Sequence, residues 1–327
     1  MAQVIGKNLL KFVVLMFAVS VVTFLLVGIS PIDPVQANVG QAAYAGMSPE
    51  KKADLAAYWG SNLPVWQRYL NWLAAAAHGD FGVSLRFNAP VTEVLATRSL
   101  NTLVLMLVAW VLSGVIGFAM GVTAGVRQNS AFDKFVRGYC FVLASTPTFW
   151  FGLVMLIVFS VWLGWFPFGF SVPIGKSAAD VTIFDSAYHL VLPALTLSVV
   201  GVANIALHTR EKTIDVMESD YIRFAQARGM SRGEAARVHG LRNLLLPAIT
   251  LQFASVSEIF GGSVLVEQVF SYPGLGQAAV TAGTGGDAAL LVGIALVSAV
   301  IVFGGNLIAS ILYQVVDPRI KRGGGAV

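Results

Sequence analysis

Six uncharged, apolar stretches recur along the chain, separated by polar segments. They cover residues 12–29, 99–126, 138–175, 186–209, 243–257 and 288–316. Most reach the roughly 18 to 20 residues with which a helix crosses about 30 Å of hydrocarbon. We therefore predict an all-α polytopic membrane protein with six transmembrane helices, near residues 9–29, 99–126, 136–163, 186–209, 246–268 and 288–313.

The first apolar stretch has a second interpretation. Lys7 and Lys11 precede it, as basic residues precede the apolar core of a secretory signal peptide. The core is long, no convincing small-residue cleavage site follows at once, and further apolar stretches come after it. A retained first helix is therefore the interpretation that we favour.

A long polar segment, residues 31–98, follows the first predicted helix. In "SPEKKADLAAYWG", Ser48 is placed to cap a short helix that Pro49 opens and Gly60 ends. In "LPVWQRYLNWLAAAAHGD", apolar residues recur near helical spacing on one tryptophan-rich face. Such a helix suits the membrane–water boundary or a lid packed on other helices, and the pattern leaves both open.

The distribution of charge predicts the orientation. Hydrophobic residues make up 56% of the chain and charged residues only 12%, which excludes a soluble domain. If the helices alternate from a cytoplasmic N-terminus, fifteen of the 21 Lys and Arg residues face the cytoplasm and six face outside. The positive-inside rule favours this orientation, with both termini cytoplasmic, and explains the net charge of +4 without a nucleic-acid partner.

This topology predicts four parts. Residues 1–30 form an N-terminal segment and the first helix, and residues 31–98 an extracytoplasmic segment with short amphipathic helices. Residues 99–313 form a five-helix core with a cytoplasmic loop at 210–246, and residues 314–327 a cytoplasmic tail. In the core, Gly117, Gly121 and Gly125 recur at four-residue intervals, a spacing that lets helix backbones approach closely.

The sequence offers no catalytic or metal motif. "GFSVPIGKS" departs from the phosphate-binding loop, because five residues rather than four separate Gly169 from Gly175. Cys140 lies in an apolar stretch and is predicted to be a buried side chain, and the four histidines are scattered. We predict no catalytic, cofactor-binding or metal-binding residue, so the chain is not expected to be an enzyme.

The basic loop "YIRFAQARGMSRGEAARVHGLRNLLLP", residues 221–247, carries the most informative pattern. We predict a short helix over 221–228, capped by Asp220 and closed by Gly229 in a left-handed conformation. Ser231 and Glu234 are spaced as a capping box for a second helix, and Pro247 marks the start of the fifth transmembrane helix. Ile222, Phe224 and Ala225 would be available for contact. The pattern fits a helix that docks on another protein, or a basic loop attracted to anionic lipid.

This stretch resembles the cytoplasmic EAA loop of the membrane-spanning subunits of ABC importers. "ASTPTFWFGL", "VEQVFSYPGLG", "YQVVDPRIKRG" and the outer stretch "LPVWQRYLNWLAAAAHGDFGVSL" extend the resemblance over nearly the whole chain, to the first permease subunit of dipeptide, oligopeptide and nickel importers. Arg223, Phe224 and Ala225 stand where the general EAA pattern has a glutamate and two alanines. Pro247 lies eighteen positions after Gly229, as in the peptide and nickel branch.

The resemblance implies a type I ABC importer permease fold in the inner or plasma membrane. It implies a second homologous permease subunit, two cytoplasmic ATPase subunits that bind the ATP, and an extracytoplasmic solute-binding protein. The chain itself would be a non-catalytic subunit without a cofactor. The residues implied in ATPase coupling are Tyr221, Arg223, Phe224, Ala225, Ala227, Arg228, Gly229 and Pro247.

Glu258 lies about 18 Å into the predicted fifth helix, where a carboxylate is costly unless it faces protein or water. It either lines the translocation pathway, meeting a cationic group, or bonds to a partner subunit. Near the outer mouth we expect an outer gate or binding-protein contact, with a type II turn at "YPG". The residues of this expected gate are Glu267, Tyr272, Pro273 and Gly274.

Peptides are the favoured substrate, with nickel or a metal chelate as the alternative. A secondary transporter is a more remote alternative, because such proteins more often show inverted repeats or intramembrane charge relays. A membrane-embedded enzyme is disfavoured by the missing catalytic residues.

Overall fold

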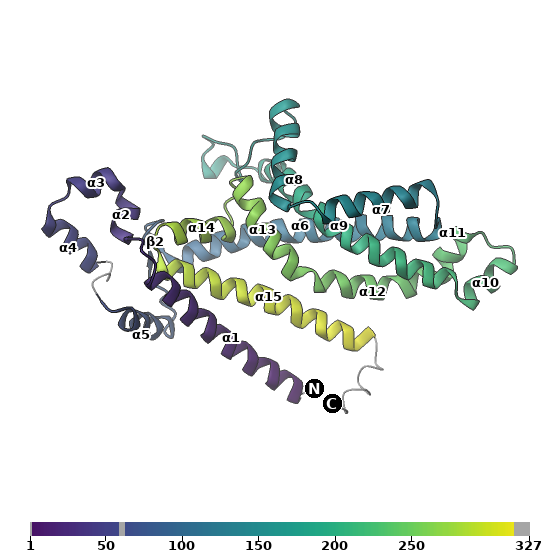
Figure 1. Cartoon of the computed structure of the whole chain (residues 1–327), viewed down its shortest axis with the longest axis horizontal. Coiled ribbons are helices and arrows are strands. Elements are labelled where there is room, and N and C mark those ends of the chain that lie inside the picture. The colour runs from purple at the N-terminus through teal and green to yellow at the C-terminus, as the bar shows by residue number, and fades with distance from the viewer. Residues whose placement is uncertain (1, 59–62, 317–327) are drawn as a thin grey trace. The chain divides into compact units, whose positions relative to one another are not determined.

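A computed structural model describes residues 2–58 and 63–316 of the chain, which are predominantly helical (Figure 1). The chain divides into two compact units. The first comprises Met1–Thr102 and Pro273–Phe303, and the second comprises Leu103–Tyr272 and Gly304–Val327. The predicted end of the short helix at Gly60 and most of the predicted tail lie outside the described residues.

The first unit contains the N-terminal helices and a small hairpin. Its elements are α1 (Ala2–Gly28), α2 (Pro34–Val39), α3 (Gln41–Gly46), α4 (Pro49–Tyr58), α5 (Val65–Ala76), β1 (Val83–Ser84), β2 (Ala89–Pro90) and α14 (Leu275–Thr284), with parts of α6 (Val91–Val126) and α15 (Ala288–Val316). β1 and β2 pair antiparallel. α1 and α15 run side by side, with the rings of Phe12 and Phe303 4.9 Å apart (Figure 1).

The tryptophan-rich helix α5 packs on α1. The rings of Tyr69 and Trp72 lie 5.4 Å and 6.2 Å from the ring of Phe24. Val65 fills the space that a side chain at Gly28 would need. The opposite face of α5 exposes Trp66. Of the two interpretations left open by the sequence, this packing supports a lid on another helix, because the inner aromatic face is occupied by protein.

The second unit is a bundle built around α9. It contains α7 (Ala131–Ala144), α8 (Thr148–Met155), the π-helical turn Leu156–Trp162, the 3₁₀ turn Ala178–Asp180, α9 (Ile183–Met217), α10 (Asp220–Ala227), α11 (Arg232–Ala235), the π-helical turn Ala236–Gly240, α12 (Leu241–Ala254) and α13 (Val256–Val269), with parts of α6 and α15. α7 lies alongside α9 (Figure 1).

The glycine stripe of α6 is the contact with α9, as its spacing predicted. A Cβ added at Gly121 would come within 2.6 Å of the carbonyl oxygen of Ala206, and one at Gly125 within 2.5 Å of Thr213. Both distances are too short for any side chain, so glycine is required for the backbones to approach this closely.

The described residues hold six candidate membrane spans if bent helix pairs are counted as one each. Three are single helices, and three are pairs bent by 107°, 43° and 49°. The sharpest bend separates α7 from α8, where a continuous helix over 136–163 had been predicted. Pro147 directly precedes α8, and the residue before a proline is disfavoured in helical conformation. The break therefore follows from a residue that the prediction overlooked.

Several helices are longer than the apolar stretches that predicted them. α6 begins at Val91 rather than near residue 99, and α9 continues to Met217 rather than ending near 209. Hydrophobicity marks the part of a helix that lies in lipid, whereas helical hydrogen bonding continues into the polar ends. The observed helices therefore extend beyond the predicted boundaries, into the polar regions outside the membrane.

Candidate coupling site

The predicted docking helix is present as α10, Asp220–Ala227, and its C-terminus is closed as expected. Gly229 adopts a φ of +96°. Its N–H donates to the carbonyl of Gln226 at 2.9 Å, and the N–H of Met230 donates to the carbonyl of Ala225 at 3.3 Å. This pair of bonds is a Schellman motif, which ends a helix in a fixed direction.

The N-cap of α10 corrects the prediction. Ser219, not Asp220, is the capping residue, and Asp220 is the first residue of the helix. The Ser219 hydroxyl donates to the carbonyl of Val216 at 2.5 Å, so it ties the end of α9 instead of capping α10 with its side chain. Asp220 still places its negative charge at the positive end of the short helix.

The burial of α10 sorts its residues into two faces. Ile222 and Ala225 are 0% and 5% exposed and pack in a cluster with Val216 and Leu244. Their predicted availability for contact is therefore wrong, because these side chains hold α10 against its own unit. Phe224 is instead 65% exposed. The outward face consists of Tyr221, Arg223, Phe224, Ala227 and Arg228, and we call it the coupling face.

Two further contacts position the coupling face. The side-chain amide of Asn243 donates to the Tyr221 hydroxyl at 2.8 Å, which ties α10 to α12. The Arg228 guanidinium lies over the ring of Phe224 at 5.9 Å. Pro247 lies inside α12 rather than at its start, so the predicted boundary there is wrong. The sequence analysis did not identify Asn243 as a contact of α10. Its position one helical turn before Pro247 was the signal that could have pointed to it.

The remainder of the loop forms α11, the π-helical turn and the start of α12. Ser231 caps α11, because its hydroxyl accepts from the N–H of Glu234 at 3.3 Å. The reciprocal bond from the Glu234 carboxylate, the other half of the predicted capping box, is absent from the described part of the chain. The arginines of the loop are exposed, which leaves its positive charge open to a partner or lipid.

A buried ion pair braces the helix that leads into α10. Asp133 of α7 is fully buried and accepts two bonds from the Arg210 guanidinium of α9, one of them at 2.8 Å. Asp133 also accepts from the backbone N–H of Asn129 at 2.9 Å. Because a bidentate pair fixes both side chains, it joins α7 firmly to α9, the helix that precedes α10.

Glu258 is exposed in the isolated chain, in the first turn of α13 beside the 49° bend. The amide of Asn204 on α9 donates to it at 3.5 Å. It borders a cavity of about 180 Å³ whose other lining residues are Thr148, Leu197, Gly201, Ile259, Gly261, Gly262 and Leu265. One turn beyond Asn204, His208 is exposed as well. The four-residue spacing of Asn204 and His208 is a polar stripe that sequence reasoning missed.

The residues of the expected outer gate occupy different settings. In the second unit, Glu267 and Tyr272 are buried, and the N–H of Tyr272 donates to the carbonyl of Glu267 at 2.9 Å. Burial and then the charge of Glu267 raise the pKa of Tyr272 to about 12. These positions suit a structural role more than an exposed contact.

Pro273 and Gly274 belong to the first unit, and the predicted type II turn is wrong. Gly274 has a φ of −105°, whereas that turn requires a positive φ there. Gly274 instead caps α14. The Asn101 amide donates to the carbonyl of Pro273 at 2.8 Å, and the Thr102 hydroxyl accepts from the N–H of Leu275 at 2.8 Å. These bonds from α6 fix the start of α14.

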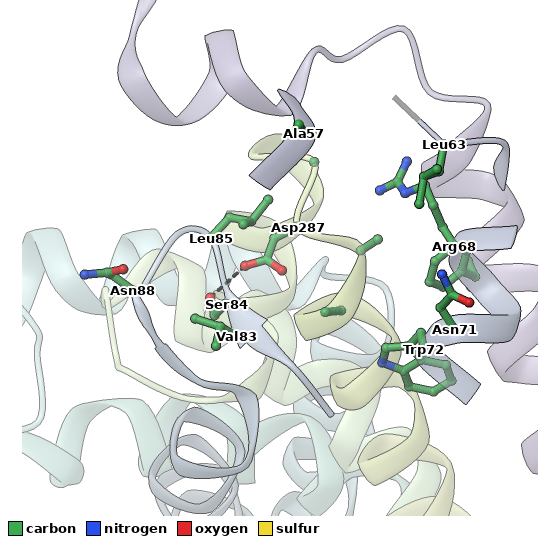
Figure 2. A pocket seen from close by; sticks show the side chains of 14 residues that line it. Ala57, Leu63, Arg68, Asn71, Trp72, Val83, Ser84, Leu85, Asn88 and Asp287 are labelled. Atoms are coloured by element: carbon green, nitrogen blue, oxygen red, sulfur yellow. Dashed lines mark hydrogen bonds between the residues drawn. The ribbon is translucent and has the colours of Figure 1, made fainter. Parts of the chain in front are cut away.

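The first unit also contains a cavity of about 530 Å³ that sequence reasoning did not foresee (Figure 2). Arg68 and Trp72 line it from α5, and Asp287 lines it from the start of α15. Asp287 is fully buried and its carboxylate accepts from the Ser84 hydroxyl at 2.6 Å. The available signal was a single arginine, Arg68, among the aromatic residues of α5.

These observations define a polytopic helical membrane protein that presents a rigid, partly aromatic helix from a basic loop. Residues 116–322 match the family described as binding-protein-dependent transport system inner membrane component. The chain belongs to this family of ABC importer permeases, which has the type I importer fold and resides in the inner membrane.

Relatives align over nearly the full length. The oligopeptide transport system permease protein AppB of Bacillus subtilis (strain 168) is 37% identical over 322 residues, covering 98% of this chain and 100% of the relative. The dipeptide transport system permease protein DppB of Escherichia coli (strain K12) is 33% identical, and the di/tripeptide permease DppB of Pseudomonas aeruginosa (strain UCBPP-PA14) is 32% identical. Both alignments cover 98% of this chain and 99% of the relative.

Proposed function

We propose that the chain is one permease subunit of an ATP-driven importer of dipeptides and oligopeptides. The peptide substrate is supported by the names of its relatives, which are permeases for oligopeptides, dipeptides and di- or tripeptides. Full-length similarity to these relatives favours peptides over nickel or a metal chelate. The chain then forms half of a translocation pathway, with a second homologous permease subunit forming the other half.

Phe224 is the observation that carries the coupling role. It is 65% exposed on a helix outside the membrane spans, where a large aromatic side chain gains stability by burial against a partner. Aromatic and arginine side chains are the residues that most often anchor protein interfaces. We assign the coupling face to the cleft of a cytoplasmic ATPase subunit, which binds the ATP that this chain does not.

The orientation follows from the charge. With the basic loop and both termini in the cytoplasm, α10 faces the ATPase subunits, and residues 31–98 face the solute-binding protein. An ATPase can drive the permease between states only if it has different affinities for them. The packed inner face of α10 and the Asp133–Arg210 pair provide the rigid connection through which such a difference acts on α7 and α9.

The coupling role is tested by transport in vesicles. The complete complex, with binding protein, is reconstituted with Phe224→Ala. Phe184→Ala, at the start of α9, is the control for loss of an exposed phenylalanine ring away from the coupling face. We expect Phe224→Ala to lose most ATP-driven uptake of a labelled tripeptide and Phe184→Ala to retain it. Normal uptake by Phe224→Ala would remove the coupling role, and uptake of nickel but no peptide would remove the peptide substrate.

Glu258 is proposed to line the pathway, since it is exposed, borders a cavity and accepts a bond from the polar residue Asn204. A carboxylate in this position attracts the peptide amino group. Glu258→Gln should slow uptake of a free tripeptide more than uptake of its N-acetylated form, which lacks that charge. If both forms slow equally, Glu258 belongs to the contact with the second permease subunit.

A further inference from the structure

The cavity of the first unit has the size and composition of a site for a small ligand. Its volume of about 530 Å³ falls within the roughly 300 to 1,000 Å³ of typical ligand pockets. α1, α5, the β1–β2 hairpin and the turn before α15 each contribute to its wall. Such pockets are mostly apolar and carry a few polar groups that orient the ligand.

Arg68 is the unusual group in this cavity. Its side chain is partly buried, and its guanidinium lies 5.9 Å above the ring of Phe24. Within the described ranges, it has no carboxylate at ion-pair distance and no hydrogen-bond acceptor. Burial lowers the pKa of Arg68 below its ordinary value. A desolvated cation beside empty space lacks the anion that would offset the cost of its burial.

Asp287 does not supply that anion. Its Oδ2 accepts from the Ser84 hydroxyl at 2.6 Å and from the N–H of Arg86 at 3.3 Å, and its Oδ1 accepts from the N–H of Leu290 at 3.1 Å. Figure 2 shows Asp287 bonded to Ser84 on one wall of the cavity and Arg68 extending from another. The carboxylate therefore braces the hairpin against α15, and the guanidinium remains for a ligand.

The other lining groups match the parts of a peptide. The side-chain amides of Asn71 and Asn88 are exposed and can each bond to a peptide backbone. Trp72 and Phe24 form an aromatic wall suited to an apolar side chain. A guanidinium binds a carboxylate through two parallel hydrogen bonds, which makes arginine the preferred residue for this recognition.

We propose that this cavity is a binding site for small peptides, in which Arg68 pairs with the C-terminal carboxylate. The site is separate from the cavity at Glu258, because it lies in the first unit. It rests on the proposed function, since it takes peptides as the substrate class. It gives the permease a second point of peptide contact, on the side that we assign to the solute-binding protein.

The test is direct binding to the purified complex in nanodiscs, without the binding protein. Two labelled ligands are compared, trialanine and trialanine amide, which differ only in the C-terminal carboxylate. They are applied to the unaltered complex, Arg68→Gln, Arg68→Lys and Arg86→Gln. Arg86 is exposed and does not line the cavity, so it is the matched control for loss of an arginine. Thermal unfolding of each complex shows that it is folded.

We expect trialanine to bind the unaltered complex and Arg86→Gln about tenfold more tightly than its amide, the ratio that one charge-assisted pair provides. Arg68→Gln should bind both ligands equally weakly, and Arg68→Lys should regain part of the preference. Equal binding of the two ligands to the unaltered complex, or an unchanged preference in Arg68→Gln, would overturn the proposal. So would the absence of measurable binding.

A second binding experiment tests the alternative partner for Arg68, which is an acidic side chain of the binding protein. If Arg68→Gln weakens binding of the peptide-free binding protein and leaves trialanine binding unchanged, Arg68 belongs to a protein interface and the peptide site is refuted. Uptake by the complete system separates the two proposals. Failure to import any peptide refutes the proposed function, whereas normal import with no carboxylate-dependent binding refutes the cavity site alone.

Discussion

The side-chain amide of Asn243 donates a 2.8 Å hydrogen bond to the hydroxyl of Tyr221 and so joins α12 to α10. Both residues are exposed, and Tyr221 lies on the coupling face. The ATPase subunit that we propose to bind this face would therefore act on α12 directly. This bond, with the buried Ile222 and Ala225, makes α10 a rigid part of the bundle.

Removing the Tyr221 hydroxyl should loosen this connection. Tyr221→Phe keeps the ring and deletes a bond worth about 1 kcal/mol, which corresponds to roughly a fivefold change in a two-state equilibrium. We expect peptide uptake per ATP hydrolysed to fall by about that factor. Asn243→Ala should have the same effect, and the double variant should add little.

The matched control is Tyr188→Phe, which also removes a tyrosine hydroxyl bond, here to the carbonyl of Trp165. It should leave uptake per ATP unchanged. Equal effects of Tyr188→Phe and Tyr221→Phe, or full additivity of Tyr221→Phe and Asn243→Ala, would show that the bond between α10 and α12 is not part of coupling.

Gly229 is the second test of the rigid helix end. Gly229→Ala meets no neighbouring atom, but its φ of +96° is unfavourable for alanine by roughly 1 to 2 kcal/mol. Gly233→Ala, in α11, also meets open space and has no positive φ. We expect Gly229→Ala to reduce uptake per ATP and Gly233→Ala to leave it unchanged. Indistinguishable variants would mean that the left-handed turn does not position the coupling face.

The Asp133–Arg210 pair should be a major contribution to stability. Asp133→Asn leaves the Arg210 guanidinium, which is mostly buried, without its charge partner, at a cost of about 1 to 3 kcal/mol. Asp215→Asn removes the carboxylate from the exposed Lys212–Asp215 pair, which is worth at most about 1 kcal/mol. Thermal unfolding in detergent should give a clearly lower Tm for Asp133→Asn than for Asp215→Asn. Equal Tm values would contradict the bracing role.

The sequence was sufficient for the spans and for the docking helix. Long apolar stretches are stable only in lipid, so their sequence alone indicates membrane spans. Gly229 ends α10 and Ser231 caps α11 through bonds to residues close in sequence, so the sequence alone also indicates these helix ends. The bend at Pro147 was also readable, because proline restricts the residue before it.

Other features depend on contacts between residues far apart in the sequence, which local patterns do not predict. Which face of α10 points inward is decided by Val216 and Leu244, from α9 and α12, so Ile222 was misassigned. Gly274 was read as a turn residue, but Thr102 is positioned by the fold to bond at the start of α14. At the bend between α12 and α13, the carbonyl of Gln252 accepts from the Ser255 hydroxyl and from the Trp110 indole N–H, and this second bond comes from α6. The role of Arg68 could not be predicted, because the cavity beside it is formed by the hairpin and the start of α15, which are distant in sequence.

The most direct test of the coupling face is its accessibility with and without the ATPase subunits. Cys140, the one cysteine of the chain, is replaced by alanine, and single cysteines are introduced as Phe224→Cys, Phe184→Cys and Ile222→Cys. Maleimide labelling is then followed in nanodiscs. The account predicts that the label reaches position 224 rapidly in the permease pair and slowly once the ATPase subunits are bound, while position 184 reacts at the same rate in both and position 222 stays slow. Unchanged rapid labelling at 224 with the ATPase subunits bound would contradict it.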